Sequence, residues 1–300
     1  MKAKVYLGRW RSPKAEQRFR VMEDELSRDR PGPTPEALDV ETSFGTTRAY
    51  RWPGRGTPLV FFHGIGGTGR IWTPFAASLT GRDVYAIDIM GDAGRSHQRV
   101  PYRTSADFAV WVDETLAALD IERAHLVGHS LGGFVALETA VHRPARVSSL
   151  FLLDPVGIAP LQLLKFLLWG LPILFGSLFP APIRRWIARR FRMPLLEDKR
   201  IMRMALHGQL HHPPRFPPML PFSDDDLRSI TVPVVVMVGA KSEMFDVETI
   251  VDRAGSLIPT VETHVVADAG HALTVSHFDD CLSQLKRVTD VSRRPTSEKT

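Results

Sequence analysis

The sequence predicts an α/β fold with a doubly wound, mostly parallel sheet that helices cover on both faces. Two observations support this prediction. Short, mainly apolar runs recur along the chain, and most of them are separated by segments with a helical pattern. The runs occupy residues 58–64, 83–88, 124–128, 149–154, 232–239 and 263–268. Strands of this kind that alternate with helices are typical of a parallel sheet buried on both faces.

The elements outside these runs also follow from local patterns. Residues 1–30 predict one or two polar helices that end at "RPGPTP", because proline cannot continue a helix. "ALDVETSF" and "TRAYRW" predict an antiparallel strand pair at a sheet edge, and "SADFAVWVDETLAALD" and "LGGFVALETAVHR" predict helices. We therefore divide the chain into an N-terminal helical extension, a core in two parts, an inserted helical segment and a disordered tail, at residues 1–36, 37–154 with 229–290, 155–228 and 291–300.

Composition narrows the class of protein. The chain has 300 residues, of which 44% are hydrophobic, enough to bury the core of one large domain. The N-terminus contains no apolar stretch of the length that a secretory signal needs. The single cysteine, Cys281, cannot form an internal disulfide. Both features favour a cytoplasmic location.

The positive charge is concentrated in the inserted segment. The whole chain carries a formal charge of +5, but residues 161–220 contain ten lysines and arginines against Glu197 and Asp198, a local net of +8. The stretch "LQLLKFLLWGLPILFGSLFPAPI" is strongly apolar, yet glycines and prolines interrupt it, so short helices are expected rather than a membrane span. The following "IRRWIARRFR" predicts a basic amphipathic helix, which fits a solvated face or peripheral contact with an anionic membrane. Its aromatic residues lie on the apolar arc, which argues against nucleic-acid binding.

The motif with the clearest chemistry is "GHSLGG", residues 128–133, between a predicted strand and a predicted helix. Gly128 and Gly132 flank Ser130 in the G-x-S-x-G pattern, and small neighbours permit the tight turn that exposes a nucleophilic serine. A serine hydroxyl needs a base and a group that orients that base. His271 follows the last predicted strand and is the candidate base, whereas neither His63 nor His129 is placed to act as one.

The acid remains open between three carboxylates. Glu243 follows the strand "VPVVVMVG" by four residues and is our first choice, and Asp246 in the same loop is an alternative. Asp154, at the end of "SLFLLD", is the third option.

Two backbone N–H groups would form the oxyanion hole. Leu131 directly follows the nucleophile, and Ile65 lies in "HGIGGTG", where three glycines, Gly64, Gly66 and Gly67, allow a substrate to approach the backbone. The phosphate-binding pattern G-x-x-x-x-G-K-[ST] is absent. "HGQLHHPP" has helical histidine spacing but no acidic partner, so we expect no metal site, and no cofactor is implied.

In their order along the chain, these motifs resemble the α/β-hydrolase superfamily over residues 37–290. The resemblance implies a serine esterase or lipase-type member with a helical lid inserted between strands six and seven of the family's sheet. "DIMGDAGRS" departs from the common family turn by having Asp92 and Ala93, which we interpret as a subfamily mark without catalytic meaning.

We therefore expect a serine hydrolase that cleaves a small hydrophobic ester through an acyl-enzyme. An acyltransferase, a carbon–carbon bond hydrolase and a non-catalytic ligand-binding protein are the alternatives. The lid would close over Ser130, and the expected pocket residues are His129, Leu167, Leu168, Trp169, Phe175 and Phe179.

Overall fold

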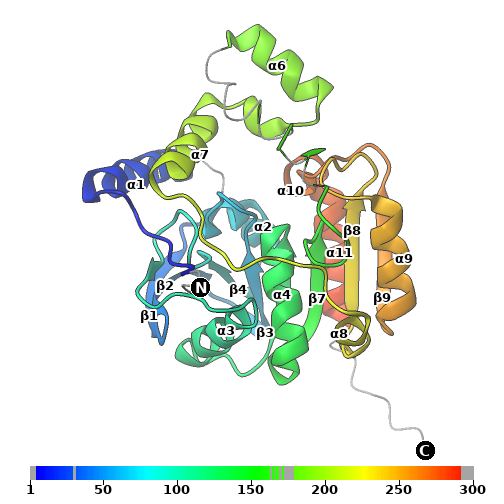
Figure 1. Cartoon of the computed structure of the whole chain (residues 1–300). Helices are drawn as coiled ribbons and strands as arrows, with labels where there is room; N and C mark the ends of the chain where they lie inside the picture. The colour runs from blue at the N-terminus through cyan, green and yellow to red at the C-terminus, as the bar shows by residue number, and fades with distance from the viewer. Residues whose placement is uncertain are drawn as a thin grey trace, which may run out of the picture.

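The computed structural model describes residues 5–29, 32–162, 164–165, 167–168, 171 and 179–291. A nine-stranded sheet crosses this part of the chain, in the order β1-β2-β4-β3-β6-β7-β8-β9, with β5 paired to β2 (Figure 1). The strands are β1 Glu36–Thr42, β2 Gly45–Trp52, β3 Arg55–Phe62, β4 Arg82–Ile87, β5 His97–Gln98, β6 Ala124–His129, β7 Val147–Leu153, β8 Val234–Gly239 and β9 Val261–Val266. The neighbouring strands in the run β4-β3-β6-β7-β8-β9 are parallel. Strand β2 pairs antiparallel with β1, β4 and β5. The predicted fold class and the antiparallel edge pair are confirmed.

Helices pack on both faces of the sheet because the strands are apolar on both sides. Along β3, Val60 and Phe62 belong to one core cluster while Leu59 and Phe61 belong to the other, as the alternation of side chains along a strand requires. The first cluster includes side chains of α3 Asp107–Ala118, α4 Leu131–His142 and α9 Val247–Leu257. The second includes side chains of α2 Thr73–Ser78 and α11 Phe278–Val291.

The segment between β7 and β8 begins above the carboxyl ends of the strands in Figure 1 and then runs down to the amino end of β8. It contains α6 Ala181–Arg190, the short 3-10 helix η4 Pro194–Leu196, α7 Lys199–His211 and α8 Asp224–Arg228. We call residues 155–228 the inserted segment. Among the residues that the structure describes, no helix is long and apolar enough to cross a membrane.

The N-terminal helix α1, Pro13–Arg28, packs against α7 of the inserted segment, a contact that the local patterns did not predict. Phe19 and Leu26 of α1 form a small buried cluster with Ala93 and Met204. The His207 ring of α7 is hydrogen-bonded to the Ala15 carbonyl, 2.8 Å away. The extension therefore connects the inserted segment to the core.

Candidate active site

Ser130 occupies the turn between β6 and α4, and the backbone there is strained. Its φ of 54° and ψ of −113° lie in a region that L-residues rarely adopt. The flanking glycines are sterically required: a Cβ on Gly128 would stand 2.2 Å from the Gly132 carbonyl oxygen, and one on Gly132 would stand 2.1 Å from that of Phe62. Ser130 is therefore held at the carboxyl edge of the sheet, as the glycine pattern predicts.

His271 lies beside this turn and pairs with Asp154. The distance from His271 Nδ1 to Asp154 Oδ2 is 2.5 Å, and both side chains are buried. Because the carboxylate accepts, Nδ1 carries the proton, which leaves Nε2 as the basic nitrogen of the neutral ring. Asp154 also accepts hydrogen bonds from the Ser242 hydroxyl at 2.6 Å and the Gly239 N–H at 3.3 Å. The carboxylate is thus oriented by three donors.

The expectation that Glu243 orients His271 is therefore wrong in this structure, where Asp154, the third choice, is the partner of Nδ1. The reason is sheet order: β7, which ends directly before Asp154, lies between β6 and β8. Glu243 Oε2 is buried without a hydrogen-bond partner, and burial raises the pKa of this carboxyl. Asp246 is likewise not the ring's partner, because it lies at the N-cap position of α9 and accepts from the Thr249 hydroxyl.

His129 connects the turn at Ser130 to the loop that carries His271. Its Nε2–H donates to the His271 carbonyl oxygen at 2.9 Å, and the two rings lie 4.8 Å apart. Burial lowers the pKa of His129 to about 4, and the neighbouring His271 acts in the same direction. His129 is therefore neutral near pH 7, and its low pKa makes it a weak proton acceptor.

The two expected oxyanion donors belong to two segments that meet at the Ser130 turn. Leu131 is the first residue of α4, where a backbone N–H has no acceptor within the helix. Ile65 lies in a turn that the Gly67 N–H closes on the Gly64 carbonyl at 3.0 Å. A Cβ on Gly64 would stand 3.4 Å from the Ser130 Cβ, so this loop directly adjoins the serine.

Fold and site together define the class of protein. The alpha/beta hydrolase fold family model matches residues 57–278, and the chain belongs to that family. The carboxylesterase YbfK of Bacillus subtilis is 29% identical over 259 residues, which cover 80% of this chain and 83% of that protein. The crystal structure of naproxen esterase from the same organism has a TM-score of 0.79 at 23% identity and covers 93% of this chain and 99% of that one. The crystal structure of the carboxylesterase CesB (YbfK) has a TM-score of 0.75 at 25% identity and covers 92% and 98% of the two chains.

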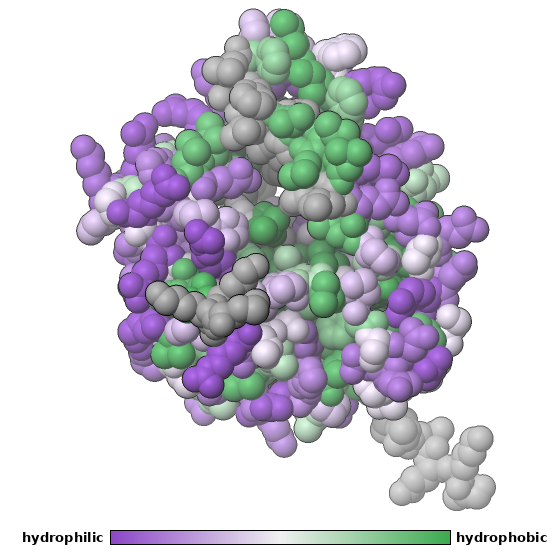
Figure 2. All heavy atoms as spheres, in the orientation of Figure 1, coloured by the Kyte–Doolittle hydropathy of each residue, from purple (hydrophilic) through white to green (hydrophobic). Residues whose placement is uncertain are grey.

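The expected acyl pocket differs from the structure in part. Leu167 and Leu168 are 57% and 55% exposed and Phe179 is 38% exposed, so these three side chains do not form a closed pocket wall. Trp169 and Phe175 lie outside the described residues. The apolar surface of the inserted segment is visible at the top of Figure 2.

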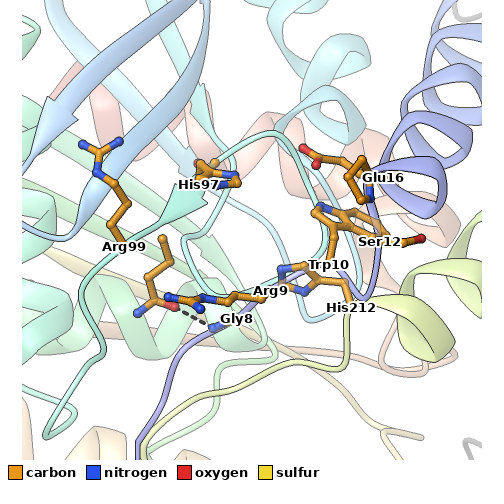
Figure 3. A pocket seen from close by; sticks show the side chains of 11 residues that line it. Gly8, Arg9, Trp10, Ser12, Glu16, His97, Arg99 and His212 are labelled. Atoms are coloured by element: carbon orange, nitrogen blue, oxygen red, sulfur yellow. Dashed lines mark hydrogen bonds between the residues drawn. The ribbon is translucent and has the colours of Figure 1, made fainter.

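A separate pocket of about 380 Å³ lies where the N-terminal segment meets β5 and the end of α7 (Figure 3). Trp10, His97 and His212 line it, together with the Gly8 backbone, whose N–H donates to Gln98 at 2.8 Å. Neither Ser130 nor His271 contributes to its lining. Within the described residues, no group of three or more histidine, cysteine or acidic side chains could hold a metal ion.

Proposed function

We propose that this protein is a serine hydrolase that cleaves a hydrophobic carboxylic ester through an acyl-enzyme. The observation that carries the proposal is the combination of Ser130 on a strained turn with the buried His271–Asp154 pair beside it. The carboxylesterase activity named for the Bacillus subtilis relatives supports an ester as the substrate.

The reaction follows from the hydrogen-bond pattern. His271 Nε2 accepts the Ser130 proton as the hydroxyl oxygen attacks the ester carbonyl, and the Leu131 and Ile65 N–H groups stabilise the oxyanion. Asp154 holds Nδ1–H and stabilises the imidazolium that forms. His271 then protonates the departing alkoxide, and a water molecule activated by the same ring hydrolyses the acyl-enzyme. Because His129 is neutral, it places no second positive charge beside the imidazolium.

A fluorophosphonate probe followed by an acyl-chain series of p-nitrophenyl esters tests this proposal. We expect stoichiometric labelling of Ser130 and faster hydrolysis of octanoate than of acetate. Folded protein that is not labelled would favour a ligand-binding role instead. Labelled protein that hydrolyses no ester would favour an acyltransferase or a carbon–carbon bond hydrolase. A preference for acetate would contradict the hydrophobic-substrate part of the proposal.

We also propose that the inserted segment contacts anionic membranes. In α6, Trp186 is 62% exposed and Ile183 is 46% exposed, and the exposed arginines Arg185, Arg189 and Arg190 lie on the same short helix. Exposed apolar side chains beside arginines suit an interface with anionic lipids. Arg184 does not belong to the basic face that the sequence predicts, because its side chain is buried and donates to the Leu196 carbonyl at 2.8 Å.

A further inference from the structure

Asp92 connects two backbone loops near the proposed oxyanion hole. It belongs to the segment 88–96 that follows β4, and only 1% of its surface is exposed. Its Oδ2 accepts the Gly66 N–H at 2.6 Å, and its Oδ1 accepts the Ala93 N–H at 2.8 Å. Burial raises the pKa of Asp92 to about 6, so the group is a carboxylate near pH 7 and both bonds have a charged acceptor.

The bond from Gly66 fixes the turn that carries Ile65. The Gly67 N–H closes this turn on Gly64, and Gly66 has a φ of +76°, which is the mark of a type II turn with Ile65 and Gly66 at its centre. In such a turn the Gly66 N–H belongs to the central peptide, and a flip of that peptide would convert the turn to type I. By holding this N–H, Asp92 selects one orientation of the peptide next to the proposed donor.

We call residues 63–69, which carry Ile65, the oxyanion loop. Segment 88–96 also holds the start of this loop, through His63. The Ile89 N–H donates to His63 Nε2 at 2.9 Å, which requires the proton to lie on Nδ1, and Nδ1 is 2.8 Å from the Gly64 carbonyl oxygen. Burial lowers the pKa of His63, which favours this neutral form. Segment 88–96 is therefore bonded to the oxyanion loop at both His63 and Gly66.

On its other side, segment 88–96 contacts the N-terminal helix and the inserted segment. Ala93 packs with Phe19 and Met204, and the Gly91 carbonyl accepts the Arg215 N–H at 3.3 Å. The chain continues from this segment into β5, which adjoins the pocket of Figure 3 and His212 at the end of α7. Packing on both sides restrains the Asp92 side chain.

We propose that Asp92 is a positioning residue for the oxyanion hole. Asp92 holds the Gly66 peptide in the orientation in which the Ile65 N–H faces the reacting carbonyl. The inference rests on the proposed function. It replaces the interpretation of Asp92 as a subfamily mark without catalytic meaning.

The test compares Asp92→Asn and Gly66→Ala with the wild type in steady-state hydrolysis of p-nitrophenyl butyrate. Asparagine retains a carbonyl acceptor but places an amide where the carboxylate has its second oxygen, and alanine disfavours the positive φ of Gly66. Loss of one oxyanion donor lowers kcat by about 10²–10³, and we expect displacement of a donor to lower kcat by about tenfold or more while KM changes little. Glu138→Gln is the matched control, because Glu138 is also a buried carboxyl but pairs with His142 on α4.

Inhibition by a trifluoromethyl ketone gives a second measurement. A general structural defect would weaken this inhibitor and a product inhibitor alike. The adduct of the ketone with Ser130 has an oxyanion, so Asp92→Asn should weaken this inhibitor by about the factor lost in kcat but leave inhibition by the product carboxylate nearly unchanged. Circular dichroism establishes that each variant is folded. Unchanged kcat in both variants overturns the inference, as does equal weakening of both inhibitors. If the fluorophosphonate fails to label the wild type, the proposed function itself fails.

Discussion

The sheet edge at Ser130 and the inserted segment above it differ in how their side chains are held. Ser130 is 3% exposed, His271 is 5% exposed and Asp154 is fully buried, and each belongs to a loop bonded to a neighbouring strand end. In the inserted segment, by contrast, Leu164 is 70% exposed and Trp186 is 62% exposed.

This difference separates the proposed chemistry from the proposed substrate recognition. Parallel strand ladders determine where the strands end, and therefore where Ser130 and Asp154 lie relative to each other. In the inserted segment, α7 packs against α1, whereas α6 leaves Ile183 and Trp186 exposed. We therefore expect substitutions at the sheet edge to abolish turnover and substitutions in α6 to change association with lipid surfaces.

The largest effect is expected for Ser130→Ala. Loss of the nucleophile in a serine triad lowers kcat by about a millionfold. The fold should persist, because the substitution removes only the hydroxyl and leaves the backbone hydrogen bonds of Ser130 in place. Turnover of p-nitrophenyl esters and circular dichroism measure the two effects, and retention of most activity would contradict the assignment of Ser130.

The next largest effect is expected for Asp154→Asn. An amide at this position favours the wrong tautomer of His271 and lowers kcat by about 10⁴. Glu243→Gln and Asp246→Asn serve as matched controls and should each lower kcat by less than about tenfold, because neither carboxyl bonds the ring. If Glu243→Gln is the most damaging of the three, Glu243 is the acid during turnover and the pairing with Asp154 is not the catalytic one.

A smaller effect is expected when Arg185, Arg189 and Arg190 are changed together to glutamine. Each charge near an anionic surface contributes about 1 kcal/mol, so binding to phosphatidylserine vesicles should weaken by about a hundredfold. Hydrolysis of soluble short esters should hardly change. A triple change of the exposed arginines Arg18, Arg55 and Arg103 is the control. Wild-type protein that ignores the vesicles at low salt would refute the membrane contact.

The smallest effect concerns the pH dependence of stability. Burial raises the folded-state pKa of Asp92 to about 6, above the value of about 3.9 for an unfolded aspartate. Between these pH values the folded state keeps a proton that the unfolded state has lost, so this group lowers the free energy of unfolding as pH rises from about 4 to about 6. His63 and Asp88 act on the pKa of Asp92, and Arg95 and Glu23 pair next to this segment.

Asp92→Asn removes this titration. The melting temperature of the variant relative to the wild type should therefore rise by a few degrees between pH 4 and pH 6 and then stay level. Glu138→Gln is not a suitable control here, because burial raises the pKa of Glu138 as well. Asp39→Asn is better, because its bond to Arg48 lowers the pKa of Asp39, so this group titrates below about pH 4 and should leave the difference nearly level between pH 4 and pH 6. A constant difference across this range would contradict the elevated pKa of Asp92.

The sequence alone determined the fold class and the positions of Ser130 and His271. Apolar runs of strand length, the G-x-S-x-G glycines and a histidine loop after the last strand are local signals, because each follows from the conformation that a few neighbouring residues can adopt. The antiparallel edge pair and the covering helices were predictable for the same reason.

Only the tertiary structure decided which carboxylate bonds His271. The same is true of the contact between segment 88–96 and Gly66, and of which side chains of the inserted segment are buried. Asp154 and Glu243 both follow strands that end at the same edge, and the choice between them depends on the order of β6, β7 and β8 in space. Asp92 and Gly66 are 26 residues apart, and Arg184 lies among exposed arginines along the same helix yet is buried. These contacts join parts of the chain that no local pattern relates, so they are set by packing alone.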